Sequence, residues 1–194
     1  MKNYIVLLQY TEGLTQYVTT MVCIAVRGQP VVGIIHNPFT GKTAWGWAGP
    51  NFVSQDVSDD IKAHFGTSDY RMHQDLSKAN IIVSRSHAGH VKEVAQAAFG
   101  ADVNVTPAGG AGFKAWEVAK GSQDAYIHAT LIKKWDICPG DALLGALGGK
   151  MTDLSGNEID YSGRPAYAKA EGGVLATLHD HNAFLEKLKP AMQT

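Results

Sequence analysis

The chain has 194 residues, enough for one domain or slightly more, and 45% of them are hydrophobic while 18% are charged. This balance predicts a globular protein with a sizeable core and excludes extended disorder. Lysine and arginine together number 17 and acidic residues 18, for a formal net charge of -1. A nucleic-acid partner is therefore disfavoured, because phosphate backbones are bound by strongly basic surfaces.

The longest apolar runs, at residues 4–8 and 21–26, are much shorter than the roughly 18 residues of a bilayer span. We therefore expect no membrane segment in this chain. Residues 4–8 follow a lysine as in a signal peptide, but the run is short and no cleavage pattern follows, so we expect a strand. Cys23 and Cys138 are the two cysteines, and their pattern indicates neither a disulfide framework nor a zinc site.

The N-terminal quarter of the chain has the pattern of an antiparallel meander. We expect strands at 17–26, 31–36 and 42–47, separated by turn signals around Gly28 and Gly41. The chain then becomes rich in Ser and Asp and loses a clear period. The predicted division is a first unit at 1–50, a connecting segment at 51–79 and a second unit at 80–194.

Strand and helix signals alternate after residue 80, which predicts an α/β unit. Ile81–Val83 is a short buried-strand signal, and helical spacing follows between a cap at Ser86 and a stop at Gly100. The remaining expected elements are a strand at 103–105, a helix at 112–120, a strand at 125–129, a helix opening at Pro139, a strand at 173–177 and a helix at 180–188.

Asp136 follows a strand and precedes Pro139, a favoured first helical position, so its carboxylate is expected near a helix N-terminus. There it is a candidate ligand for Mg²⁺, which takes oxygen atoms from one or two carboxylates and from substrate phosphate. The alternative is a plain helix cap. Asp141, one turn further, is expected only to complement the helix dipole. Lys133 and Lys134 form either a solvated face or a source of positive field.

The segment Gly109–Lys114 opens a helix after a strand, so its backbone N–H groups and the lysine are a candidate phosphate cradle. It matches neither the P-loop nor the dinucleotide fingerprint, and a plain strand-to-helix turn is the alternative. Ser84–His87 stands at the carboxyl end of a strand, where open α/β sheets bind ligands. Arg85 and the hydroxyls are candidates to hold phosphate or sugar oxygens, with a helix cap at Ser86 as the alternative.

The remaining histidines and tryptophans are assigned structural roles. His90, His179 and His181 lack the context of a metal site, so we expect surface residues. His87 is a candidate contact because it lies beside the two serines. The tryptophans at 45, 47 and 116 are expected to be core or interface anchors.

Several of these segments together resemble the inositol monophosphatase-like, Mg²⁺-dependent and lithium-sensitive phosphatases. The segments are Lys133–Cys138 with Ala146–Gly156, Ile81–His87 with Pro107–Gly112, Tyr10–Leu14 with Val18–Val22, Ile35–Phe39, and Tyr126–His128. Within that superfamily they resemble the 3'(2'),5'-bisphosphate nucleotidase branch and its Golgi-resident members. The resemblance covers residues 9 to about 189.

The resemblance implies a layered α/β/α/β/α sandwich and hydrolysis of the 3'-phosphate of adenosine 3',5'-bisphosphate by water activated between Mg²⁺ ions. It places a metal ligand at Asp136. It places substrate contacts at Ser84, His87, Gly110 and Lys114. It also implies a Golgi location, although no targeting signal is recognised and the chain as given is expected in the cytoplasm.

The family's other metal aspartates align with Lys2 and Ile5, and its catalytic threonine aligns with Leu7. None of these side chains performs that chemistry, so we expect an N-terminally truncated fold with weak or absent catalysis. We also expect an uncovered apolar sheet face and a tendency to form a homodimer. The alternatives are a non-catalytic nucleotide-binding or oligomerisation module and, in third place, an inositol phosphate phosphatase.

Overall fold

The computed structural model describes residues 11–49, 52–54, 59, 75–85, 88–162, 167–168 and 173–192. The strands are β1 (Thr20–Val26), β2 (Gln29–His36), β3 (Thr43–Trp47), β4 (Phe52–Val53), β5 (Asn80–Ser84), β6 (Asn104–Ala108), β7 (Ala125–His128), β8 (Ile132–Lys133), β9 (Lys150–Asp153), β10 (Tyr167–Ala168) and β11 (Val174–Thr177). The helices are α3 (Ala88–Phe99), α4 (Ala111–Ala119), α5 (Lys134–Ala146) and α6 (His181–Ala191), with 3-10 turns η1 (Thr15–Tyr17) and η2 (Leu76–Lys78).

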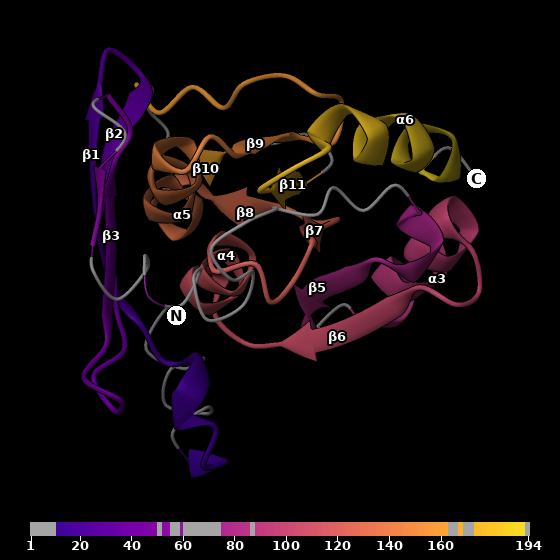
Figure 1. Ribbon diagram of the computed structural model, residues 1–194, viewed down its shortest axis with the longest axis horizontal. Coiled ribbons are helices and arrows are strands. Elements are labelled where there is room, and N and C mark those ends of the chain that lie inside the picture. Colours follow the sequence, from indigo (N-terminus) through magenta and orange to yellow (C-terminus); the bar gives the residue numbers. More distant parts are fainter. Residues whose placement is uncertain are drawn as a thin grey trace.

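The described elements form alternating layers (Figure 1). An antiparallel sheet in the order β1-β2-β3-β4 packs against α5, which lies beside α4. A mixed sheet in the order β6-β5-β7-β11-β9 follows, and α3 and α6 pack together on its far face. This arrangement confirms the predicted α/β class. No helix among the described residues has the length and apolar character needed to cross a bilayer.

The first sheet confirms the predicted meander, with small differences at its ends. Residues 15–17 form the turn η1 instead of the start of a strand, and β4 extends the sheet into the segment expected to be a connection. On the inner face, a Cβ at Gly33 would collide with the carbonyl of Pro139, and a Cβ at Gly46 would lie 3.1 Å from Leu143. Glycine at both positions therefore allows the sheet to approach α5 closely.

The sequence pattern of strands and helices is strong at residues 80–128 because the strands of this segment belong to the mixed sheet. β5 runs parallel to β6 and β7, and its residues Ile81, Ile82 and Val83 are all buried, as expected for a strand covered on both faces. Pro107 is tolerated in β6 because β6 is an edge strand. The strands β8, β9 and β10 are only two to four residues long and were not predicted from the sequence.

The expected start of α5 was wrong. The helix begins at Lys134, so Pro139 lies in its second turn. Helical backbone formed by the residues before a proline is disfavoured but not forbidden, and packing of α5 against the first sheet overrides that preference here. Likewise α6 extends to Ala191 and includes Pro190 in its last turn.

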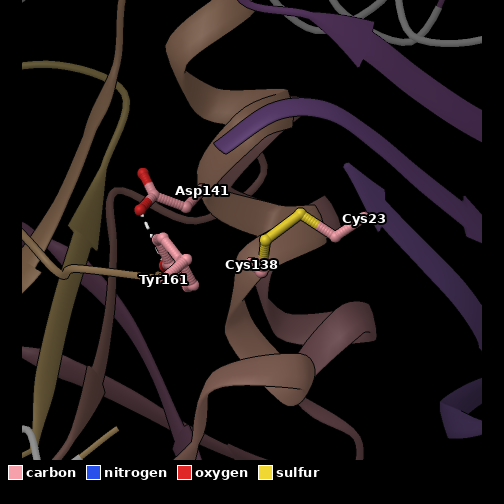
Figure 2. The surroundings of a disulfide bond; sticks show 4 residues. All are labelled: Cys23, Cys138, Asp141 and Tyr161. Carbon is pink, nitrogen blue, oxygen red and sulfur yellow. Dashed lines mark hydrogen bonds between the residues drawn. A yellow bond between two sulfur atoms is a disulfide. The ribbon is translucent and has the colours of Figure 1, made fainter. Parts of the chain in front are cut away.

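The expectation for the cysteines was also wrong. Cys23 on β1 and Cys138 on α5 form a disulfide across 115 residues, with their Cα atoms 5.8 Å apart (Figure 2). Two isolated cysteines this far apart in sequence give no spacing pattern. The pairing follows from the packing of the inner face of β1 against α5. It ties the first sheet to the helix that carries Asp136.

The opposite face of the first sheet confirms the expected uncovered apolar surface. The exposed fractions are 52% for Val22, Ile24 and Val26, 39% for Trp45 and 49% for Trp47. Neither tryptophan is therefore a core residue, in contrast to Trp116, which is buried. We call this side of β1, β2 and β3 the outer face.

Candidate functional site

Three of the five predicted site residues lie together near the amino-terminal ends of α4 and α5, and the fourth, Ser84, pairs with Ala108, whose carbonyl oxygen accepts from Lys114. Ser84 is the last residue of β5, Gly110 is the N-cap of α4, and Lys114 lies one turn into α4. Asp136 lies in the first turn of α5, and its negative charge acts on Lys114. His87 lies outside the described residues.

Asp136 is the third residue of α5, inside the helix instead of before it. A carboxylate in the first turn interacts favourably with the helix dipole and the free N–H groups there. The side chain is partly buried. Burial and then the charge of Asp136 raise the pKa of Tyr126, while the same charge opposes the fall that burial causes in the pKa of Lys114, so these three side chains share one electrostatic environment.

Lys114 is the most unusual group at this site, with only 3% of the residue exposed. Its ammonium donates hydrogen bonds to the carbonyl oxygens of Gly110 at 2.8 Å and Ala108 at 3.5 Å, and lies 5.0 Å from the Tyr126 ring centroid. Burial lowers the pKa of Lys114 to about 7, against the opposing effect of Asp136. Lys114 therefore gains or loses its charge near neutral pH.

The glycines before Lys114 are required by packing. Gly110 has a positive φ of 63°, and a Cβ there would collide with the carbonyl of Tyr17. A Cβ at Gly112 would meet the sulfur of Met21 and lie 2.8 Å from the hydroxyl oxygen of Thr19. The start of α4 thus fits closely against the segment that leads into β1, which favours the plain-turn interpretation.

Sequence reasoning missed Tyr126 on β7 as a member of this site. The residue is 1% exposed, and its hydroxyl has no hydrogen-bond partner in the structure. Burial and the charge of Asp136 both raise the pKa of the phenol. A buried tyrosine in a strand is common, so only the neighbouring charges at positions 114 and 136 mark this one.

The Arg85 side chain pairs with a carboxylate in this structure and gives no indication of an anion site. Its guanidinium donates to the Glu12 carboxylate at 3.2 Å, and both side chains are exposed. Exposed pairs of this kind contribute little to stability. Ser84 remains partly buried at the end of β5, in the position the sequence predicted.

The prediction that His181 is a surface residue was wrong. His181 is buried and lies between the hydroxyl groups of Thr152 at 2.9 Å and Thr177 at 3.0 Å. Burial, helped by Lys150, lowers its pKa to about 4, so the ring is neutral at pH 7. The two hydrogen bonds of His181 connect α6 to the mixed sheet. His179 is partly buried, and burial lowers its pKa as well.

Asp141 does more than complement the helix dipole. It is partly buried in α5, where the Tyr161 hydroxyl donates to its carboxylate at 2.7 Å (Figure 2). Burial raises the pKa of Asp141 to about 7, although the hydrogen bond from Tyr161 opposes the rise. Figure 2 shows this pair beside the disulfide. Asp141 and Cys138 lie on α5, the helix that also carries Asp136.

Mg²⁺ needs several well-placed oxygen atoms. Among the described residues, no group of three or more His, Cys, Asp or Glu side chains is arranged to surround a metal ion. Asp136 is the carboxylate of the predicted site, and the described residues alone do not fit a two-metal centre.

The inositol monophosphatase family model matches residues 8–192. This chain belongs to the inositol monophosphatase family. Similar curated members include "Inositol monophosphatase 3" of Danio rerio, 46% identical over 187 residues, covering 93% of this chain and 50% of the relative. Human "Golgi-resident adenosine 3',5'-bisphosphate 3'-phosphatase" is 46% identical over 193 residues, covering 96% of this chain and 49% of the relative. The chain thus spans about half the length of these relatives.

Solved structures of the inositol monophosphatase family share the fold. The enzyme from Anabaena (Nostoc) sp. PCC 7120 has a TM-score of 0.69 at 21% identity, covering 94% of this chain and 68% of that structure. Inositol monophosphatase-II from Staphylococcus aureus has a TM-score of 0.70 at 15% identity, covering 96% of this chain and 65% of that structure. These matches confirm the predicted fold type.

Proposed function

We propose that this member of the inositol monophosphatase family acts on the 3'-phosphate of adenosine 3',5'-bisphosphate as a phosphoric monoester hydrolase. The proposal rests mainly on its 46% identity over 193 residues to a relative named for that phosphatase activity. The grouping of Asp136 and Lys114 at the ends of two helices supports it. That name also supports a Golgi location for this chain.

In this proposal the residues of the candidate site have the following roles. Lys114 and the backbone at Gly110 bind the phosphate, because the ammonium is buried among groups that a phosphate oxygen can replace. Approach of a phosphate raises the pKa of Lys114 from about 7 and so restores its charge. Ser84 and His87 contact the nucleotide.

In this proposal Asp136 would be a ligand of a Mg²⁺ ion, and that ion would neutralise charge on the phosphate. One carboxylate is a poor site for an ion that gives up its water reluctantly. We therefore expect weak or absent turnover by this chain alone.

A second candidate function is nucleotide binding without catalysis, with a homodimer as its possible form. It is favoured by the finding that the described residues form no cluster of three potential metal ligands. An inositol phosphate substrate is the third candidate. The relative of Danio rerio named as an inositol monophosphatase is as similar as the nucleotide phosphatase, at 46% identity.

The test is phosphate release from adenosine 3',5'-bisphosphate or an inositol monophosphate, with Mg²⁺ and with or without lithium. Asp136→Asn is compared with Asp102→Asn, which changes an exposed aspartate away from the site. Release that requires Mg²⁺ and Asp136 supports the hydrolase. Calorimetric binding of the nucleotide without release supports the binding module. The proposal would be refuted if the chain did not bind the nucleotide and did not release phosphate from it.

A further inference from the structure

The Tyr126 side chain lies at the candidate site, but the proposed function gives it no role. The residue belongs to β7, in the middle of the mixed sheet, where it pairs with Ile82 of β5 and Ala176 of β11. Only 1% of the residue is exposed. Because two neighbouring strands and a close-packed core fix its place, the ring is a rigid surface for the groups that lie on it.

The ammonium group of Lys114 lies over this ring. Its Nζ atom is 5.0 Å from the ring centroid, within the roughly 6 Å range in which the electron-rich face of an aromatic ring attracts a cation. This attraction is strongest where water is excluded, and only 3% of Lys114 is exposed. The attraction also favours the charged amine, whereas burial lowers the pKa of Lys114 to about 7.

The other contacts of Lys114 fix the position of the ammonium group without using all of its donors. An ammonium group has three donors, and the carbonyl oxygens of Gly110 and Ala108 accept two of them, at 2.8 Å and 3.5 Å. The ring attracts the whole positive charge, so it still acts when a phosphate oxygen accepts from Nζ. A lysine side chain is long and flexible, and holding it in place before the ligand arrives lowers the entropy cost of binding.

We propose that Tyr126 is a positioning residue for phosphate binding, whose ring face holds the Lys114 ammonium group where a phosphate ester binds. This inference rests on the proposed function, which assigns Lys114 to the phosphate. The Tyr126 hydroxyl has no hydrogen-bond partner among the residues that the structure describes, so it does not hold the lysine. The role therefore depends on the electron density of the ring.

The test changes the electron density of the ring and nearly preserves its shape. Tyr126→Phe is the reference, and a phenylalanine with three fluorine atoms on its ring is then incorporated at position 126, because fluorine withdraws electron density from the ring face. Binding of adenosine 3',5'-bisphosphate is measured by titration calorimetry without divalent cations. We expect Tyr126→Phe to bind like the parent and the fluorinated ring to bind roughly fivefold more weakly.

The matched control places the same fluorinated residue at Phe99, a buried ring that packs against Phe184 in the other part of the core. This change should leave nucleotide binding unaltered, and circular dichroism establishes that each protein is folded. Proton NMR of the ligand-free protein tests the contact directly. The methylene protons beside the Lys114 amine should resonate upfield of those of exposed Lys92, both in the parent and in Tyr126→Phe, because they lie over a ring face.

Equal nucleotide affinity with the fluorinated and the reference ring would overturn this proposal alone. A loss of binding in Tyr126→Phe would also overturn it, because the hydroxyl would then be the group that acts. Lys114 resonances without the upfield shift would overturn it without any bearing on the proposed function. A parent chain that does not bind the nucleotide would overturn both proposals.

Discussion

Asp141 offers a direct test of the electrostatics of α5. Its carboxyl group is buried, accepts one hydrogen bond from Tyr161, and lies near the negative charge of Glu158. Burial raises its pKa from 3.8 to about 7 in the folded chain. Between these two pH values the folded protein holds a proton that the unfolded chain has lost. Stability is therefore greatest below about pH 4 and falls as the pH rises to 7.

The size of the effect follows from that difference in pKa. Each pKa unit corresponds to about 1.4 kcal/mol, so a pKa of 3.8 unfolded and about 7 folded removes about 4 kcal/mol of unfolding free energy by pH 8. Asp141→Asn keeps the shape of the side chain and an oxygen that accepts from Tyr161, but it cannot ionise. We expect the variant to match the parent near pH 4 and to exceed it by about 4 kcal/mol at pH 8.

The assay is urea unfolding followed by tryptophan fluorescence at pH 4, 5.5 and 8, with Asp102→Asn as an exposed control. At pH 5.5 the unfolding free energy of Asp141→Asn should exceed that of the parent by about 2 kcal/mol. Tyr161→Phe removes the hydrogen bond that lowers the pKa of Asp141, so it should extend the loss of stability to higher pH. A difference between Asp141→Asn and the parent that stays constant from pH 4 to pH 8 would refute the reasoning.

Two further predictions concern Tyr126 and the disulfide. Tyr126→Phe removes a buried hydroxyl that has no hydrogen-bond partner, so thermal unfolding should show unchanged or higher stability. Tyr161→Phe removes the hydrogen bond to Asp141 and should lower the unfolding free energy by about 1 kcal/mol or more. Equal losses in both would contradict this. Cys138→Ser removes a cross-link spanning 115 residues and should cost about 2–5 kcal/mol in urea unfolding under oxidising conditions. The same substitution made under reducing conditions should cost much less, and an equal loss there would indicate that the bond does not form.

Much of the local structure could be predicted from the sequence, because neighbouring residues decide it. The alternating apolar pattern before residue 50 predicted the meander, and the run Ile81–Val83 predicted a buried strand. The position of Asp136 near a helix N-terminus and of Ser84 at a strand end also follow from local signals. The family motifs predicted the fold type.

Tertiary packing decided the features that depend on distant residues. The disulfide joins positions 115 residues apart, and the bond between Asp141 and Tyr161 joins a helix to a loop 20 residues away. The buried charge of Lys114 and the unpartnered hydroxyl of Tyr126 arise only when β7, α4 and α5 meet. Sequence patterns report the preferences of neighbouring residues, whereas burial and electrostatic coupling depend on which segments the folded chain brings together.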